Sequence, residues 1–478
     1  MTLRNKIVKN LLWPVYNLLY KINPNIANNV KVELWRWRVG QRTAPIERKI
    51  KKAIKKKFLW PVYDIVYKIN SRLATKIKIK LWEWYTWHQI NCHGTDNNNG
   101  ISRILIDSTY TSRVNDNGGI QRVVRNIGTE IINSGKEYTF VQLIAGKLIT
   151  NYEYMYKLKN EKYNGLEKKV IINQGDVLFL LDPTWDRYSE FLLIINQIHE
   201  KNGKVIAIIH DLFPIQYPQL FESASGRDVF KLWHEMIIQN CDQIVCDSRT
   251  TIIAVLKYLS NNNRSIVTEL FYFHLGATIS NENKKKEVRE YIKNIFDFNG
   301  KIFLMVGTVE PRKGHDIVVK AIEKILAQRK NVKLLIIGHD GWKNDTFLLH
   351  LKRSKYYNDK VIWINDATDD EVIYSYIYSD CLIAASQDEG FGLPLIEAAH
   401  FGLPIICSDI PIFHEVAGGN VTYFPVMDTE ALVQTLISWL KEEKHPDSNK
   451  IKIYTWAESA QEILNIMDDK VKPYKILQ

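Results

Sequence analysis

The chain has 478 residues, of which 46% are hydrophobic, and its formal net charge is +11. The length predicts about three domains of roughly 150 residues each, and the apolar content is that of an ordinary globular protein. We expect neither a signal peptide nor a membrane span, because no window approaches the roughly 18 uncharged apolar residues that a span needs. The cysteines are scattered and form no Cys-x-x-Cys pair, which predicts buried thiols in a reducing compartment: Cys92, Cys241, Cys246, Cys381 and Cys407.

The positive charge lies at the N-terminal end. Residues 1–90 carry 20 Lys and Arg against 4 Asp and Glu, whereas the remainder carries 44 basic and 49 acidic residues. The same segment contains a repeat, since residues 12–23 recur at 59–70 without gaps. Two copies are too few for a solenoid, so we predict a basic extension over residues 1–95 with a tandem helical repeat.

The composition of this extension indicates a docking function. Lys and Arg beside Trp, Tyr and Leu on short amphipathic elements are typical of proteins that lie on a membrane surface. Each basic residue of the cluster at 49–57 would contribute about 1 kcal/mol near an anionic leaflet. We therefore expect residues 1–90 to bind an anionic membrane, with docking of a partner protein or a second copy as the alternative. Nucleic acid is not expected, because no binding motif accompanies the charge.

An α/β pattern follows a polar stretch at 93–100, which we interpret as a linker. Short apolar runs alternate with helical periodicity, and this alternation predicts βαβ units and parallel sheets. We expect domains at 101–280 and 300–455, separated by a charged connection, and a last helix within 456–478. The expected strands are 103–107, 177–181, 205–209 and 243–246, then 302–306, 332–337, 361–364, 381–385 and 404–408.

The most informative motif is the run Glu389-Gly-Phe-Gly-Leu-Pro-Leu-Ile-Glu397. It follows an expected strand and opens a helix, which places it at the carboxyl end of a sheet, where α/β folds bind ligands. Eight positions are just over two helical turns, so both carboxylates lie roughly on one face. Glycine amides and a helix start favour a phosphate, and carboxylates accept hydroxyl groups, so the motif predicts a nucleotide-sugar site. The alternative is a structural pair: Glu389 at a helix start and Glu397 in solvent.

Three further motifs stand at expected strand ends or helix starts. Arg312 and Lys313 follow Gly307 and would form a cationic cradle for a diphosphate, unless they are an ordinary solvated pair. His210 ends an apolar run and is either a donor contact or a structural histidine. Gly118-Gly119 opens a helix, where the amides would meet a donor phosphate or the glycines would serve a packing turn.

Together these motifs resemble retaining glycosyltransferases of family 4, whose E-x7-E signature matches Glu389 and Glu397. The resemblance implies the GT-B architecture: two Rossmann-like parallel-sheet domains that face a cleft, with residues 456–478 crossing back to the first. It implies that Glu389 holds the sugar hydroxyls, Glu397 the ribose hydroxyls, and that His210 faces the donor sugar. Thr308 stands where the family commonly has an arginine, so the phosphate charge would rest on Arg312 and Lys313. The remaining implied donor contacts are Gly118, Gly119, Gly307, Gly390, Phe391, Gly392 and Leu393.

The expected reaction is transfer of a sugar from a nucleotide diphosphate, with retained anomeric configuration, to a lipid-linked or polysaccharide acceptor. The wording of the motifs is most similar to bacterial mannosyl- and rhamnosyltransferases of surface polysaccharide, including lipopolysaccharide, which favours GDP-mannose as donor. No DxD pair ends a strand, so we expect no metal or other cofactor. We expect a cytoplasmic protein, peripheral at the inner membrane face. Two alternatives remain: a catalytically weak GT-B scaffold that recruits partner transferases, which Thr308 favours, and a GT-B nucleotide-sugar epimerase.

Overall fold

The computed structural model describes residues 94–114, 118–221, 224–261, 268–277 and 288–477. These residues form two α/β domains, each built on one sheet. The predicted tandem repeat, and the membrane or partner docking assigned to it, fall on residues that lie outside the described ranges. In the described part, the helices and strands appear in the α/β alternation that the sequence predicts.

The first domain contains a ten-stranded sheet in the order β1-β5-β4-β3-β2-β6-β7-β8-β9-β16, counted over the described residues. Strands β3, β2, β6, β7, β8 and β9 pair in parallel, while β4 and β16 run antiparallel to their neighbours β3 and β9. The bounds are β1 Thr95–Asp96, β2 Ile104–Asp107, β3 Tyr138–Ile144, β4 Lys147–Thr150, β5 Lys169–Val170, β6 Val177–Leu180, β7 Lys204–Ile209, β8 Gln243–Cys246, β9 Thr268–Tyr272 and β16 Lys475–Leu477.

The second domain contains a six-stranded sheet in the order β12-β11-β10-β13-β14-β15, and all its pairs are parallel. The bounds are β10 Lys301–Val306, β11 Val332–Ile337, β12 Val361–Ile364, β13 Cys381–Ala384, β14 Ile405–Ser408 and β15 Thr422–Phe424. The chain builds outward from β10 to β12 on one side and then from β13 to β15 on the other. The strand order therefore reverses between β10 and β13, and such a switch point opens a crevice at the carboxyl ends of the two strands.

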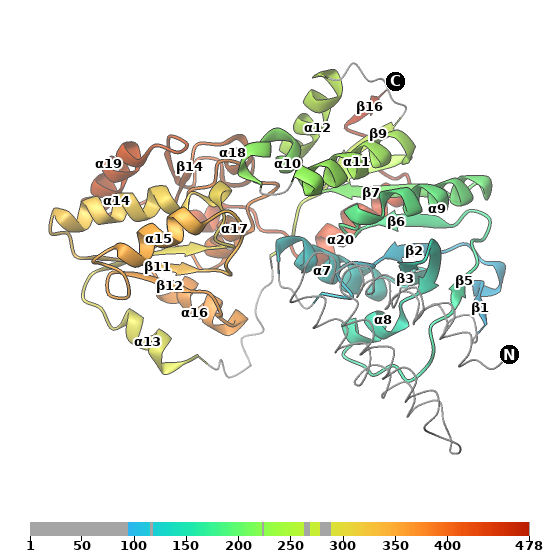
Figure 1. Cartoon of the computed structure of the whole chain (residues 1–478), viewed down its shortest axis with the longest axis horizontal. Helices are drawn as coiled ribbons and strands as arrows, with labels where there is room; N and C mark the ends of the chain where they lie inside the picture. The colour runs from blue at the N-terminus through green and yellow to red at the C-terminus, as the bar shows by residue number, and fades with distance from the viewer. Residues whose placement is uncertain (1–93, 115–117, 222–223, 262–267, 278–287, 478) are drawn as a thin grey trace, which may run out of the picture. The chain divides into compact units, whose positions relative to one another are not determined.

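Helices connect these strands (Figure 1). In the first domain they are α7 Gly119–Asn133, α8 Tyr152–Leu158, η4 Trp185–Arg187, α9 Tyr188–Glu200, α10 Phe213–Gln216, η5 Pro218–Leu220, α11 Ala224–Asn240 and α12 Arg249–Asn261, with η3 Asn98–Gly100 before them. The second domain and the C-terminal segment contain α13 Glu290–Phe296, η6 Pro311–Lys313, α14 His315–Ala327, α15 Asp345–Arg353, α16 Asp369–Tyr378, α17 Leu393–His400, α18 Pro411–Ala417, α19 Thr429–Trp439, η7 Ser448–Lys450 and α20 Trp456–Met467. Capping boxes begin α16 and α20, because a threonine and the glutamate three positions later satisfy each other's backbone amides.

The cores follow from the period of two along each strand. In β2, Ile104 and Ile106 are buried on the face that α7 covers, while Leu105 is buried on the face that carries α9. Figure 1 shows α7 and α8 on one face of the first sheet and α9 and α11 on the other. Because both faces are covered, the central strands are apolar at most positions, and their carboxyl ends emerge at one edge.

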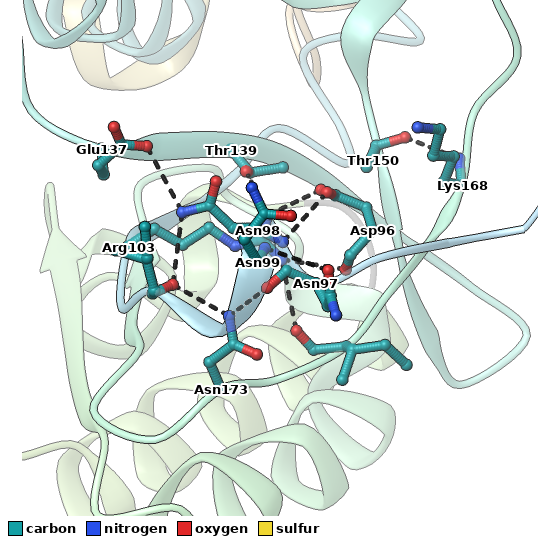
Figure 2. Close-up of polar contacts among 12 residues, drawn as sticks. Asp96, Asn97, Asn98, Asn99, Arg103, Glu137, Thr139, Thr150, Lys168 and Asn173 are labelled. Carbon is teal, nitrogen blue, oxygen red and sulfur yellow. Dashed lines mark hydrogen bonds and ion pairs between the residues drawn. The ribbon is translucent and has the colours of Figure 1, made fainter.

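The stretch at 93–100, interpreted above as a linker, is part of the first domain wherever it is described. Strand β1 pairs with β5, and Asn173 Nδ2 donates to the Asn97 carbonyl at 2.6 Å. Figure 2 shows Arg103, almost fully buried, with Nη1 donating to Asp96 Oδ2 at 2.7 Å and to Thr139 Oγ1 at 3.0 Å. The Arg103 guanidinium therefore ties the segment before the first apolar strand onto the edge of the sheet.

The C-terminal segment returns to the first domain. Helix α20 packs against α7, and β16 adds to the sheet beside β9. Lys136 pairs with Asp468, and Lys204 Nζ lies 2.7 Å from Asp469 Oδ1. The two domains are thus joined by chain crossings at both ends of the second domain.

Candidate active site

A cavity of about 1010 Å³ lies between the two domains. It is lined by the start of α7, the carboxyl ends of β7, β10 and β11, and the turn that leads into α17. The structure places every predicted site residue in this lining: Glu389, His210, Lys313, Arg312, Glu397, Gly390, Phe391, Gly392, Leu393, Gly118, Gly119 and Gly307. Residues from four separate motifs therefore share one cleft.

Glu389 lies at the centre of a network of opposite charges. Its Oε2 accepts from Arg312 Nη1 at 2.9 Å, and its Oε1 accepts from Lys313 and from Ser386 Oγ at 2.6 Å. Burial opposes ionisation, but Arg312 and Lys313 outweigh it and lower the pKa of Glu389 to about 2. Glu389 is consequently a carboxylate at neutral pH and can only accept hydrogen bonds.

Arg312 and Lys313 form the turn η6 that follows β10. The Arg312 guanidinium also donates to Glu310 Oε1 at 2.6 Å, and it lies 4.5 Å from the ring centre of Phe213 on the first domain. Gly314 ends the turn at φ 69°, and a Cβ there would lie 2.2 Å from the Ala385 carbonyl oxygen, so only glycine fits. Arg312 and Lys313 therefore lie together in the cleft, with both charges balanced by carboxylates of the same domain, and their role as a cradle for a diphosphate stays a prediction.

Glu397 lies in α17, and its carboxylate accepts hydrogen bonds from side chains of both domains. Its Oε1 accepts from Arg122 Nη2 on α7 at 2.6 Å, and its Oε2 accepts from the Tyr376 hydroxyl at 2.8 Å. The Glu397 charge raises the pKa of Arg122. Glu397 is thus not a solvated surface residue. Neither partner was predicted from the sequence, although Arg122 stands three positions after the Gly118-Gly119 pair.

The Gly390-Phe391-Gly392 turn lies directly on the first domain. A Cβ on Gly390 would lie 2.4 Å from the His210 carbonyl oxygen, and the Gly390 carbonyl accepts from Ser248 Oγ at 2.8 Å. Gly392 has φ 98°, and a Cβ there would lie 2.9 Å from the Phe413 ring. Gly390 therefore permits close packing between the domains, and Gly392 permits close packing within the second domain at the start of α17.

His210 and Asp211 directly follow strand β7, and Asp247 directly follows the neighbouring strand β8. His210 Nδ1 lies 3.4 Å from Asp247 Oδ2, and its Nε2 is buried without a hydrogen-bond partner among the described residues. Asp211 faces Arg312. Burial raises the pKa of Asp211 to about 6, although Arg312 opposes the shift. Asp211 and Asp247 were not singled out from the sequence. Asp211 could have been, because it adjoins His210 at the strand end.

The remaining predicted glycines lie at the start of α7 and directly after β10. Gly118 is the N-cap of α7, and a Cβ on Gly119 would lie 3.9 Å from Leu393 Cδ1, so the starts of α7 and α17 are neighbours across the cleft. Gly307 has φ 139°, and Lys313 lies against it. The Thr308 methyl faces Gly341, where a Cβ would lie 2.9 Å from it.

A pair of buried carboxylates anchors the segment that leads to α7. Asp182 Oδ2 accepts from the backbone amides of Tyr110 at 2.5 Å and Thr111 at 2.7 Å, and Oδ1 accepts from Thr111 Oγ1 at 2.6 Å. Asp107 accepts from Thr109 and Thr184. Burial and the nearby Asp107 charge raise the pKa of Asp182 to about 8. The protonated form is thus favoured in the folded protein.

Asp182→Asn should reduce the loss of stability as the pH rises. The unfolded carboxyl has a pKa near 3.8 and the folded one near 8, so the folded state binds more protons between these values and its advantage is lost as the pH rises through 8. Asparagine resembles the protonated form, since its amide can donate to Thr111 Oγ1. We expect the melting temperature of the wild type to fall more steeply from pH 6 to 9 than that of Asp182→Asn, measured by differential scanning fluorimetry. Parallel pH profiles would contradict this.

The described residues contain neither a candidate metal site nor a candidate membrane-spanning helix. No group of three or more His, Cys, Asp or Glu side chains in that part of the chain is arranged to hold a metal ion. Within the same ranges, no helix is both long and apolar enough to span a membrane.

Comparison with known proteins places the second domain in a family. Residues 288–456 match the family described as Glycosyl transferases group 1. The chain is 29% identical over 377 residues to the serotype-specific mannosyltransferase WbdA of Escherichia coli, a match that covers 76% of this chain and 46% of WbdA. It is 26% identical over 268 residues to the O-antigen chain mannosyltransferase RfbU of Salmonella typhimurium, covering 53% of this chain and 70% of RfbU. The chain thus spans about half the length of WbdA.

Solved structures show the same fold. Sucrose-phosphate synthase from Thermosynechococcus elongatus superposes with a TM-score of 0.56 at 17% identity, covering 77% of this chain and 99% of that one. Anabaena HepE in complex with UDP and glucose superposes with a TM-score of 0.51 at 12% identity, covering 77% of this chain and 95% of that one. The predicted GT-B class of two parallel-sheet domains is confirmed, and residues 288–456 are similar to the glycosyl transferases group 1 family.

Proposed function

We propose that this protein is a glycosyltransferase that moves a hexose from a nucleoside diphosphate to a polysaccharide or lipid-linked acceptor. The observation that carries the proposal is the Glu389–Arg312–Lys313 network, which lies in the cleft together with Glu397, all within the residues that match the group 1 family. The names of WbdA and RfbU, both mannosyltransferases, favour mannose from GDP-mannose. An O-antigen type of polysaccharide is the corresponding acceptor.

The geometry supports a division of work between the two glutamates. Glu389, ionised and anchored by two cations, accepts hydrogen bonds from the donor sugar, and Glu397 accepts them from the ribose. The diphosphate lies beside Lys313 and the amides at the start of α17, which stabilise the negative charge that develops there. The bond between the sugar C1 and the phosphate oxygen breaks, and the acceptor oxygen bonds to C1 on the same face. The acceptor proton passes to the leaving phosphate oxygen, so the configuration is retained and no metal is required.

We also propose that residues 1–90 hold the enzyme at the cytoplasmic face of an anionic membrane, where a lipid-linked acceptor would be found. The charge of this segment, 20 basic against 4 acidic residues, and its repeated aromatic motif support the proposal. Docking onto partner transferases is the competing use of the same segment. Pelleting the full chain with anionic vesicles at low and moderate salt distinguishes them, since failure to pellet would exclude membrane docking.

Incubating the purified chain with a panel of nucleotide sugars should release a nucleoside diphosphate from one donor, measured with a coupled assay. Glu397→Ala and Lys313→Ala should each lower the release roughly 100-fold, because each removes a direct donor contact. Arg353→Ala, an exposed charge outside the cleft, is the matched control and should retain full activity. If no donor of the panel released a nucleoside diphosphate, even with membrane extract as acceptor source, the result would overturn the proposal in favour of a scaffold.

A further inference from the structure

Arg122 brings a cation from the first domain to the donor side of the cleft. It lies on the first turn of α7, its side chain is 31% exposed, and its Nη2 reaches Glu397 on α17 at 2.6 Å. Because Gly119 lies against Leu393, the starts of α7 and α17 are neighbours at this point. Arg122 therefore lies beside the helix start where the proposed function places the ribose and the diphosphate.

Arg312 and Lys313, the two cations at η6, pair with carboxylates of their own domain. Arg312 is bound by Glu310 and by Glu389, and Lys313 is bound by Glu389. These contacts lie within one domain, and they offset positive charge that a diphosphate would otherwise meet in full. Arg122 differs, because its carboxylate partner is the residue to which the ribose is assigned.

Ribose hydroxyl groups can replace the guanidinium at Glu397. The Tyr376 hydroxyl already occupies Glu397 Oε2, so Oε1, which Arg122 holds, is the oxygen that the ribose would take. A guanidinium released at that position lies beside a diphosphate, and the planar fork of arginine matches phosphate oxygens with two parallel hydrogen bonds.

Resting on the proposed function, we propose that Arg122 is a ligand of the donor diphosphate, and that Glu397 holds it until the ribose takes its place. It would supply from the first domain the guanidinium that Thr308 does not supply from the second. Arg122 then couples donor binding to the position of the two domains, since it reaches the second domain through Glu397 in the free protein and through the diphosphate in the donor complex.

The test compares nucleoside diphosphates with their nucleosides, using the full chain. GDP and UDP are titrated by calorimetry, and guanosine and uridine by ligand-observed NMR, against wild type, Arg122→Ala, Arg122→Lys and the control Arg353→Ala. Arg122→Ala should weaken binding of the diphosphate on the order of 10- to 100-fold, as expected for lost hydrogen bonds to a charged group. Its affinity for the nucleoside should be unchanged or higher, because Glu397 Oε1 is freed. Arg122→Lys should recover part of the diphosphate affinity.

The outcomes separate this proposal from the one on which it rests. Equal weakening for diphosphate and nucleoside would mean that Arg122 only orients Glu397, and it would overturn the role in phosphate binding. Unchanged diphosphate affinity in Arg122→Ala would overturn it as well. If the wild type bound neither GDP nor UDP, the result would count against the proposed function itself, before any variant is considered.

Discussion

Glu389→Gln is expected to lower kcat roughly 100- to 1,000-fold, the usual loss when a charged group that is organised for the transition state is removed. Glutamine keeps the shape of the side chain but not its charge, so Arg312 and Lys313 lose the carboxylate that positions both of them. The sugar hydroxyls lose an ionised acceptor at the same time. The measurement is nucleoside diphosphate release at saturating donor, with Glu443→Gln, an exposed glutamate outside the cleft, as control.

Glu389→Gln should also make the free energy of unfolding less dependent on pH at the acid end of the range. The lowered pKa of Glu389 means that its stabilising effect is present above the unfolded pKa of 4.5 and is lost as the pH falls toward 2. Glu389→Gln should therefore destabilise the protein near neutrality and have little effect at the acid end of that range. Full activity in Glu389→Gln would refute the central role of this carboxylate.

Gly390→Ala is expected to lower kcat on the order of 100-fold, through displacement of the domains and without any loss of a chemical group. The added Cβ would lie 2.4 Å from the His210 carbonyl oxygen and 3.4 Å from Asp247 Oδ2, so the turn must withdraw from the first domain. A shift of about 1 Å in a reacting geometry can cost this much. The measurement is steady-state kinetics, together with thermal unfolding to show that both domains remain folded.

Gly419→Ala provides the matched control for this change. A Cβ on Gly419 would meet no atom within 4 Å, so the same substitution is made without a collision. Activity of Gly390→Ala equal to that of Gly419→Ala would show that the close approach at the turn does not position the catalytic groups.

Much of the fold follows from local pattern. The expected strands 243–246, 332–337 and 361–364 coincide with β8, β11 and β12, because strands buried on both faces are apolar at most positions and are bounded by helical periodicity. Strands β3, β4 and β5 were not expected. These strands lie toward one edge of the first sheet, where β4 and β5 are short and β4 runs antiparallel to both β3 and β5. The formation of such strands depends on a neighbouring strand that is already in place.

The candidate site was likewise predictable only in part. Motif resemblance located Glu389, Glu397, Arg312 and Lys313, and the matched family covers the domain that holds them. Assignment to family 4 and the retaining mechanism stay predictions. The partners were not predictable: Tyr376 and Arg122 meet at Glu397 from positions 21 and 275 residues away along the chain.

The sequence by itself determined the α/β class, the positions of most central strands, and the chemical character of the loops that follow them. Periodicity and the residue types of a loop are local properties, so they are legible without coordinates. Tertiary structure alone decided that Arg122 binds Glu397, that Gly390 lies against His210, and that Glu389 holds both Arg312 and Lys313. These contacts depend on how the sheets and their loops come together in space, and no local pattern encodes the distance between residues far apart along the chain, whether they lie on two domains or on one.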